Sequence, residues 1–245
     1  MEWLSPTGIA EACRMLSTPG ARLIAGCTAV QPRSLLRAEA EPLIDLSGLV
    51  GLQKISRDGD SIFIGAMVPI DTLASDQQLA ADLPLLTHVA RQIGDAVIRR
   101  QATIGGNLMA RGGWEIPAAL LALGAYLRIA DASGERSADA ADLCSSDGAL
   151  AEGEILVGVE VAVQRDMPWS YRRATTNGGA YLCAIAGTRG SNGPNLFLAG
   201  GASHPMPLAS VSALPSLRTD ALASGAYRRR LASVLAAEAR AEIVA

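Results

Sequence analysis

The chain has 245 residues, of which 49% are hydrophobic and 18% charged, a composition typical of a globular protein with a substantial core. Its net charge of −3 leaves no basic footprint for nucleic acid. The sequence has no apolar run long enough for a membrane-spanning helix, and its first residues lack the pattern of a secretory signal. We therefore expect a cytoplasmic protein with no nucleic-acid partner and no membrane span.

Residues 1–55 are predicted to form a small α/β unit. Thr7 can cap a helix that places Ile9, Cys13 and Leu16 on one face. Short strands are expected at residues 22–25 and 43–46, and two strands joined after a helix favour parallel pairing.

Residues 56–165 mix strands and helices. The predicted strands are residues 61–66, 126–129 and 155–161. The predicted helices are a short one capped by Asp71, one over residues 83–93, and one over residues 117–123 with Pro117 in its first turn.

The last zone, residues 166–245, is predicted to contain strands near residues 170–173, 181–186 and 196–198, followed by a long helix over about 223–243. The predicted apolar face of this helix consists of Leu231, Val234, Leu235 and Ala239. Arg228 to Arg230 are expected on its solvated face.

Two segments with small residues carry the chemical information. In the first, a strand runs directly into Gly26 and its small neighbours, where successive N–H groups can surround a phosphate oxygen. The full stretch is Leu23, Ile24, Ala25, Gly26, Cys27, Thr28, Ala29 and Val30.

The second segment runs from Ala102 to Leu108. Gly105 and Gly106 permit positive φ and close backbone approach, while Thr103 and Asn107 offer a hydroxyl and an amide for phosphate or ribitol groups. Neither segment is a G-x-G-x-x-G fingerprint, so the residues alone do not distinguish FAD from another diphosphate ligand.

No metal site is expected in this chain. Cys13, Cys27, Cys144 and Cys183 are too scattered for a C-x-x-C pair and are interpreted as small apolar residues. The same spacing cannot supply the four thiolates of an iron–sulfur cluster.

Together, the segments resemble the FAD-binding subunit of the molybdenum hydroxylases, a family that includes the medium subunit of carbon monoxide dehydrogenase and the flavin subunit or domain of xanthine dehydrogenase. Its A-G-G-x-x-L loop corresponds to residues 25–30, with Cys27 in place of the second glycine, and its T-I-G-G-N loop is intact at residues 103–107. An acidic residue, Glu115, precedes a Pro-Ala-rich helix. Corroborating matches are residues 43–49, the strand from Ile155, residues 198–202 and residues 227–231.

This resemblance implies an α+β fold. Residues 1–165 would form a two-part FAD-binding domain of the vanillyl-alcohol oxidase/p-cresol methylhydroxylase type. Its parts would be a small parallel α/β unit (about 1–55) and a mixed or antiparallel α/β unit (56–165). Residues 166–245 would form a small C-terminal α+β domain with a three-stranded antiparallel sheet and helices.

The resemblance also implies a function. The chain would be an FAD-dependent oxidoreductase subunit that passes electrons from [2Fe–2S] clusters of an iron–sulfur subunit to an external acceptor. A large molybdopterin-binding subunit would hydroxylate the substrate, in a heterotrimer or a dimer of heterotrimers. No residue of this chain is then needed as nucleophile or general base, because the flavin supplies the redox chemistry.

Roles for single residues follow from the same resemblance. Backbone N–H groups from Gly26 to Ala29 would hold the FAD pyrophosphate, and Gly105 and Gly106 would approach it from the other side. Glu115 would accept a hydrogen bond from a ribose or ribityl hydroxyl. Leu156 would contact the isoalloxazine or adenine, and Arg173, in place of a family lysine, would bring positive charge near the reduced flavin.

Two alternatives stay open at this level. A flavin-free structural adaptor of the same complex is suggested by Cys27 and by the altered stretch around residues 176–181. A free-standing flavin oxidase is disfavoured because the chain offers no separate substrate domain. NAD, quinone and dioxygen all remain candidate acceptors.

Overall fold

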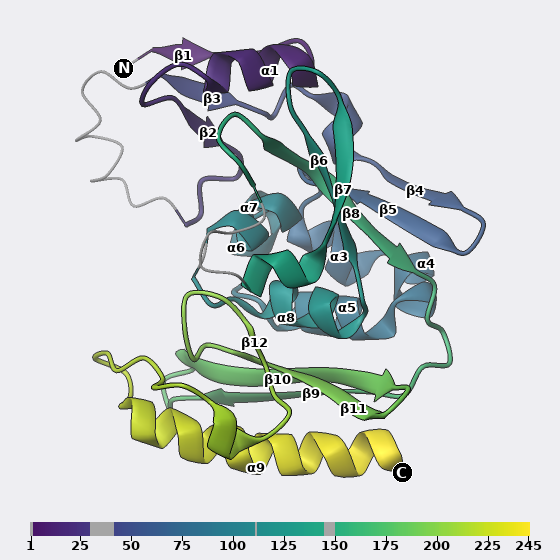
Figure 1. Ribbon diagram of the computed structural model, residues 1–245, viewed down its shortest axis with the longest axis vertical. Helices are drawn as coiled ribbons and strands as arrows, with labels where there is room; N and C mark the ends of the chain where they lie inside the picture. The colour runs from purple at the N-terminus through teal and green to yellow at the C-terminus, as the bar shows by residue number, and fades with distance from the viewer. Residues whose placement is uncertain (1, 30–41, 111, 145–149) are drawn as a thin grey trace. The chain divides into compact units, whose positions relative to one another are not determined.

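The computed structural model describes residues 2–29, 42–110, 112–144 and 150–245 (Figure 1). Val30 and the Cys144 side chain, both named above, lie outside the described part. The fold is α+β, with one parallel and two antiparallel sheets. Contacts divide the chain into two compact units, and each is described by itself. Unit 1 comprises Met1–Thr72, Ile93–Ala110 and Tyr126–Ala162, and unit 2 comprises Leu73–Gln92, Arg111–Ala125 and Val163–Ala245.

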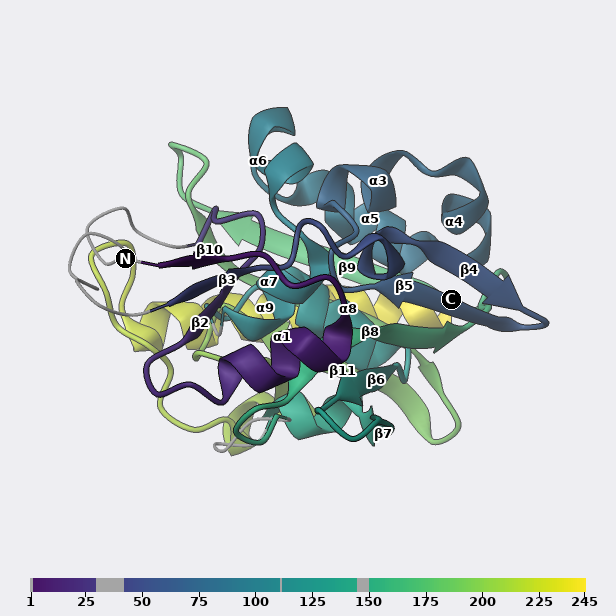
Figure 2. The same cartoon turned by 90° about the horizontal axis from the view of Figure 1, so that it is seen from above.

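Unit 1 begins with a three-stranded parallel sheet. Its order is β1 (Trp3–Leu4), β3 (Leu43–Asp45) and β2 (Arg22–Ile24), with Ile24 beside Asp45 in the register. Helix α1 (Ile9–Leu16) lies alongside it (Figure 2). The predicted parallel pairing of the two longer strands is confirmed.

The predicted cap of α1 is wrong. Gly8 is the N-cap residue and makes no side-chain cap bond. Thr7 instead donates from both its backbone N–H and its hydroxyl to the Glu11 carboxylate, each at 2.7 Å. The start of the helix is therefore stabilised by the Glu11 carboxylate in its first turn, whereas the sequence predicted that the Thr7 hydroxyl would cap it.

A five-stranded antiparallel sheet forms the rest of unit 1. The strands, in spatial order, are β4 (Ile55–Asp58), β5 (Ser61–Gly65), β8 (Ile155–Ala162), β6 (Tyr126–Ala130) and β7 (Glu135–Asp139). One apolar cluster joins α1 and β3 to the ends of β6 and β8. Within it, the Cys13 thiol donates to the Ala130 carbonyl at 3.5 Å. Residues from both predicted subdomains therefore share a core.

Short helices and single-turn segments complete unit 1. They are η1 (Val50–Gln53), α6 (Ala96–Gln101), α7 (Ile104–Met109) and η2 (Ala140–Cys144), and α3 (Ile70–Ser75) starts in this unit. Neither α6 nor α7 is predicted by the sequence. Asp95 caps α6 by accepting a hydrogen bond from the N–H of Ile98, and this helix leads directly into the second glycine segment.

Unit 2 is built on a four-stranded antiparallel sheet, where three strands were expected. Its order is β12 (Met206–Pro207), β11 (Gly193–Ala199), β10 (Tyr181–Gly190) and β9 (Trp169–Thr175). The additional strand, β12, has only two residues and no apolar alternation, so the sequence gives no signal for it.

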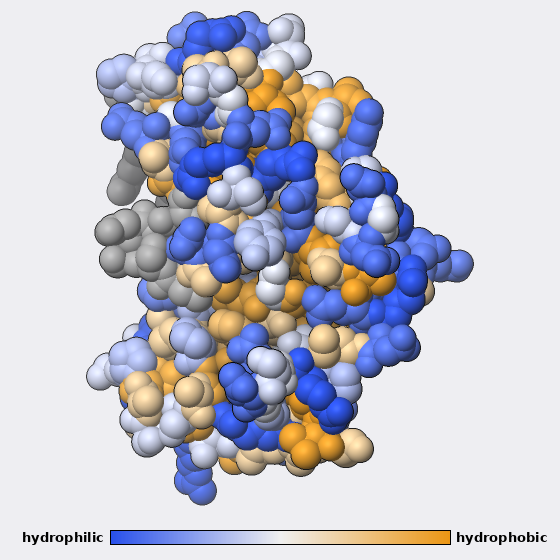
Figure 3. Space-filling view, turned by 45° about the vertical axis from the view of Figure 1, so that its right-hand side comes forward, coloured by the Kyte–Doolittle hydropathy of each residue, from blue (hydrophilic) through white to orange (hydrophobic). Residues whose placement is uncertain are grey.

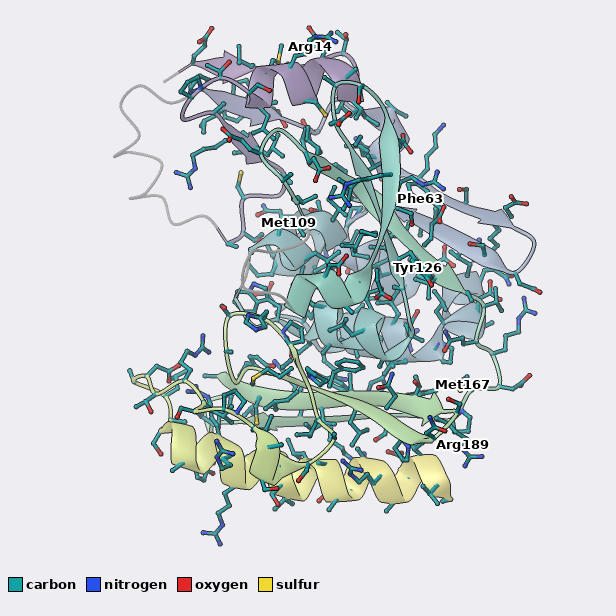
Figure 4. The ribbon with its side chains drawn as sticks, in the orientation of Figure 1. Arg14, Phe63, Met109, Tyr126, Met167 and Arg189 are labelled. Carbon is teal, nitrogen blue, oxygen red and sulfur yellow. The ribbon has the colours of Figure 1, made fainter. Side chains whose placement is uncertain are left out.

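Helices cover both faces of this sheet. One face carries α5 (Pro84–Gln92), which follows α4 (Gln77–Asp82), and α8 (Glu115–Ala122), where the Thr188 hydroxyl donates to the Ala122 carbonyl at 2.6 Å. The other face carries α9 (Gly225–Val244), preceded by η3 (Val211–Ala213). Arg189, labelled in Figure 4, donates to the Ile243 carbonyl at 2.6 Å and so ties the end of β10 to the last turn of α9.

Helix α9 buries most of the predicted face: Ala239 is fully buried and Leu231 and Leu235 pack against the core, but Val234 does not. Its fully buried positions are Arg228, Ala232, Ala236, Ala239 and Ile243, whereas Val234 is 53% exposed. The buried alanines allow this helix to lie close to the sheet. The sequence-based prediction looked for large apolar residues and therefore missed two of the alanines, Ala232 and Ala236.

Arg228 is not on the solvated face, as was predicted, but fully buried. It forms a two-pronged ion pair with Asp220, 3.0 Å to each oxygen, and donates to the carbonyls of Leu182, Arg218 and Ala223. Hydrogen bonds from Arg228 lower the pKa of Asp220 to about 2. A buried guanidinium persists because its donors find acceptors on all sides.

In the described part of the chain, no helix combines the length and the apolarity needed to cross a membrane. On the face seen in Figure 3, hydrophobic and hydrophilic residues alternate in patches. The family model reported below ends at residue 163. The predicted division into domains at residue 165 stays a prediction.

Candidate functional site

The first glycine segment follows directly after β2. Among the described residues, none accepts a hydrogen bond from the N–H of residues 25–29. Cys27 has a φ of +54°, the left-handed conformation that a side chain disfavours. Successive N–H groups around a left-handed residue are the geometry of an anion-binding nest.

Gly26 packs against the end of α6. A Cβ atom at this position would collide with the carbonyl oxygen of Gln101 and approach Ala102 Cα to 3.2 Å. The two glycine segments, 75 residues apart as counted from Gly26 to Gln101, therefore lie against each other. This convergence is what the sequence-based hypothesis requires, and only a residue without a side chain allows it.

The second segment is the start of helix α7 and not a loop. Thr103 is its N-cap, and its hydroxyl oxygen accepts from the N–H of Gly106 at 3.0 Å. The N–H groups of Ile104 and Gly105 donate to the carbonyls of Val68 and Ala66. The amides of this first turn are thus already paired, in contrast to those of residues 25–29.

The reason predicted for the two glycines is also only half right. Neither Gly105 nor Gly106 has a positive φ. Close approach is what requires them: a Cβ on Gly105 would lie 2.8 Å from the Ala66 carbonyl oxygen, and one on Gly106 would lie 3.0 Å from the Thr103 hydroxyl.

Asn107 follows these glycines and has an unfulfilled acceptor. Its Oδ1 atom is buried and receives no hydrogen bond from the described residues. A buried carbonyl without a donor costs free energy unless a ligand or water supplies one. Asn107 is therefore ready to accept a hydrogen bond from a hydroxyl group.

Leu156 lies on β8, beside Ile129 in the sheet, at a register shift between β6 and β8. Its exposed fraction is only 4%. The structure thus places it in unit 1 with the glycine segments, and it offers a ligand little free surface.

Glu115 and Arg173 form the centre of a cluster in unit 2. Glu115 opens α8 and is 4% exposed, and its Oε1 lies 3.1 Å from Arg173 Nε. Tyr171 donates its hydroxyl to the same Oε1 at 3.1 Å. Burial raises the pKa of Glu115, and the charge of Arg173 and the Tyr171 hydrogen bond oppose that shift.

Tyr181 extends this cluster. The Arg173 guanidinium lies over its ring, 5.5 Å from the centroid. Its hydroxyl is buried and has no partner among the described residues, and burial raises its pKa well above the usual value. Like the buried amide oxygen of Asn107, this hydroxyl is an unsatisfied polar group beside small residues, since a Cβ on Gly200 would lie 3.0 Å from it.

The predicted site residues thus fall into two groups. Residues 23–29, 102–107 and Leu156 lie in unit 1, and Glu115 and Arg173 lie in unit 2 and contact each other. Sequence reasoning missed Tyr171 and the site role of Tyr181. The signal available for Tyr171 was its position two residues before Arg173, because alternate residues of a strand share a face.

The sequence is similar to a known protein family and to several of its members. Residues 1–163 match the family model described as the FAD binding domain in molybdopterin dehydrogenase. The chain is 32% identical over 202 residues to the carbon monoxide dehydrogenase medium chain of Hydrogenophaga pseudoflava, covering 78% of this chain and 70% of that one. It is 31% identical over 188 residues to the nicotine 6-hydroxylase medium subunit of Paenarthrobacter nicotinovorans, covering 74% of this chain and 65% of that one. The match thus spans slightly less than two thirds of the nicotine enzyme's subunit.

Solved structures agree on the fold. A chain of the Cu,Mo-CO dehydrogenase in its cyanide-inactivated form superposes with a TM-score of 0.86 at 27% identity, covering 100% of this chain and 98% of that one. A chain of quinoline 2-oxidoreductase from Pseudomonas putida 86 superposes with a TM-score of 0.84 at 24% identity, covering 100% and 95%. The mixed α+β architecture is therefore that of the carbon monoxide dehydrogenase medium subunit. With the family model covering two thirds of its length, the chain belongs to the family of FAD-binding domains of molybdopterin dehydrogenases.

Proposed function

We propose that this chain is the FAD-binding electron-transfer subunit of a molybdenum-containing hydroxylase or dehydrogenase. In this role it takes electrons from [2Fe–2S] clusters of a partner subunit and delivers them to an external acceptor. The observation that carries the proposal is the backbone of residues 25–29, whose N–H groups have no acceptor in the part of the chain that the structure describes. At Gly26 this backbone packs against the segment that precedes α7.

The residues present fit the diphosphate of FAD. In the proposal, the N–H groups of Gly26, Cys27, Thr28 and Ala29 donate to the pyrophosphate, because they have no other acceptor among the described residues. The Asn107 Oδ1 atom accepts from a ribityl hydroxyl, and the Thr103 hydroxyl, whose oxygen already accepts from Gly106, donates its proton to an oxygen of the cofactor. Gly105 and Gly106 contribute by their small size, since the amide of each is already paired.

Glu115 and Arg173 supply charge in the proposal. The Glu115 Oε1 atom is engaged by Tyr171 and Arg173, so Oε2 is the oxygen left for a ribose or ribityl hydroxyl. Arg173 is 24% exposed and brings a permanent positive charge, which favours the reduced, anionic form of the cofactor. FAD itself, when bound, supplies the chemistry of accepting and releasing electrons.

The partners and location belong to the same proposal. An iron–sulfur subunit would supply the electrons, and a large molybdopterin-binding subunit would carry out hydroxylation, in a heterotrimer or a dimer of heterotrimers in the cytoplasm. Support comes from the names of the relatives, which are medium subunits or chains of larger enzymes.

Titration of the flavin-free chain with FAD, FMN and riboflavin tests the proposal. Quenching of flavin fluorescence should report tight binding of FAD and binding at least about 100-fold weaker for FMN and riboflavin, which lack the pyrophosphate. Equal binding of all three would refute the pyrophosphate site.

One observation favours the alternative of a flavin-free adaptor, namely the Cys27 side chain within the nest. The side chain stands at a left-handed position where the family loop has a glycine, and its bulk is what would oppose a pyrophosphate. Its charge would not, because partial burial and the Asp45 charge raise the pKa of the thiol, which donates to the Ala25 carbonyl at 3.4 Å. The adaptor predicts no binding of any flavin while the complex still assembles.

A further inference from the structure

The outward face of helix α9 carries apolar side chains between charged ones. Opposite the face packed on the sheet, the exposed side chains include Tyr227 at 51% and Val234 at 53%, with Ala237 and Ala241 further along the same side. We call these four residues, together with Arg230 and Glu238, the outer stripe.

Tyr227 and Val234 are large apolar side chains that stay more than half exposed on this face, two turns of helix apart. In unit 2, α9 forms the outermost layer on its side of the sheet, and nothing in that unit covers the outer stripe (Figure 1). Figure 3 shows apolar atoms reaching the surface at the lower edge of the view, the level at which α9 lies in Figure 1. The outer stripe therefore has the character of an uncovered contact surface.

The charges of the outer stripe are arranged symmetrically. Arg230 precedes Val234 by four residues and Glu238 follows it by four, so that each lies about 6 Å along the axis from Val234. Arg230 has no ion pair or hydrogen bond with any other described residue. Glu238 is 54% exposed and lies 3.7 Å from Arg172 Nε, whereas Arg172 has its closer contact, 3.0 Å, with Glu242.

We propose that the outer stripe binds the outer stripe of a second copy of this chain, with the two helices antiparallel and the two-fold axis at Val234. Antiparallel pairing about Val234 places Arg230 of one copy opposite Glu238 of the other, twice. It also places the large Tyr227 opposite the small Ala241. A surface that complements itself in both charge and size is what a two-fold symmetric interface requires.

The size of this surface sets the expected strength. A helix of 20 residues is about 30 Å long, so one helix pair buries less than the area of a standard interface. The self-association is accordingly weak, with a dissociation constant on the order of 10 µM for the isolated chain. This inference is independent of flavin binding.

Sedimentation velocity of the full-length chain, from about 1 to about 200 µM, tests the proposal. The wild type should shift from monomer to dimer over this range. Val234→Glu should remain monomeric, because it buries two like charges at the axis. Arg230→Glu and Glu238→Arg should each weaken the dimer at least about tenfold, and the double variant R230E/E238R should restore it.

Leu222→Glu is the matched control, because Leu222 is 50% exposed in the same unit but lies before α9. It should dimerise like the wild type, and circular dichroism should show native folding for all variants. A wild type that stays monomeric throughout, a dimer that Val234→Glu leaves intact, or a double variant without rescue would each overturn the proposal.

Discussion

The glycine segments of unit 1 and the Glu115–Arg173 cluster of unit 2 present polar groups in different ways. The first is made of backbone. The N–H groups of residues 25–29 have no acceptor within the described ranges, and the contact at Gly26 exists because a side chain is missing. The second is made of side chains, with the Glu115 carboxylate contacted by both the Arg173 guanidinium and the Tyr171 hydroxyl. A backbone site depends on the absence of atoms, and a side-chain site depends on the presence of every partner, so substitutions should damage them differently.

The largest effect is expected at the side-chain cluster. Glu115→Ala removes the acceptor shared by Arg173 and Tyr171 and leaves a guanidinium and a hydroxyl without it, which should lower the free energy of unfolding by about 3 kcal/mol. Urea denaturation measures this. Glu115→Gln keeps an acceptor oxygen and should cost about 1 kcal/mol. Equal stability of both variants and the wild type would show that the cluster contributes nothing to the fold.

At the backbone site, adding one carbon should be enough to cause damage. Gly26→Ala puts a Cβ against the Gln101 carbonyl and should cost about 2 kcal/mol while weakening FAD binding at least about tenfold. Gly51→Ala is the matched control, because nothing lies within 4 Å of its Cβ, and it should change neither quantity. If Gly26→Ala and Gly51→Ala have the same stability and the same affinity for FAD, the site does not depend on the contact between Gly26 and Gln101.

At Cys27, a substitution is expected to raise the stability of the fold and not to lower it. Its φ of +54° costs an L-residue roughly 1–2 kcal/mol, and glycine, after its larger loss of chain entropy, should stabilise the fold by about 0.5 kcal/mol. Thermal unfolding of Cys27→Gly measures this gain, and Cys27→Ala, which removes the thiol but keeps a Cβ, should show none. A stabilised Cys27→Ala would point to the thiol and not to the backbone.

The smallest effect is in the pH dependence of the cluster. Because burial raises the folded-state pKa of Glu115 above its ordinary 4.5, the folded protein holds this proton to higher pH than the unfolded chain does. The Glu115 contribution to stability is therefore present below that ordinary value and is lost as pH rises through the folded pKa. Measured from pH 4 to 7, the stability of Glu115→Gln relative to the wild type should rise with pH, and a fall would mean that Arg173 outweighs burial.

The same contrast explains how much the sequence could reveal. The sequence identified Gly26 and Gly105, where a Cβ would meet backbone atoms of another segment, and the parallel pairing of β2 and β3 follows from local patterns. Glu115 and Arg173 were each identified, but their contact spans 58 residues and no local pattern records it.

The errors have a common physical origin. Helix α7 has two glycines in its first turn and is held by hydrogen bonds to Ala66 and Val68, which lie on a distant segment. Arg228 looks like a surface residue until Asp220 and three carbonyls are placed around it. In each case tertiary partners override local propensity.

Amide chemical shifts of the isotopically labelled chain test the central claim most directly, namely that the free N–H groups of residues 26–29 receive a pyrophosphate. On addition of FAD, and also of ADP, we predict the largest downfield proton shifts at Gly26 to Ala29. The amides of Ile104 to Gly106, which already donate within the protein, should move little. If the amide chemical shifts of residues 26–29 do not change at saturating FAD, the account is contradicted.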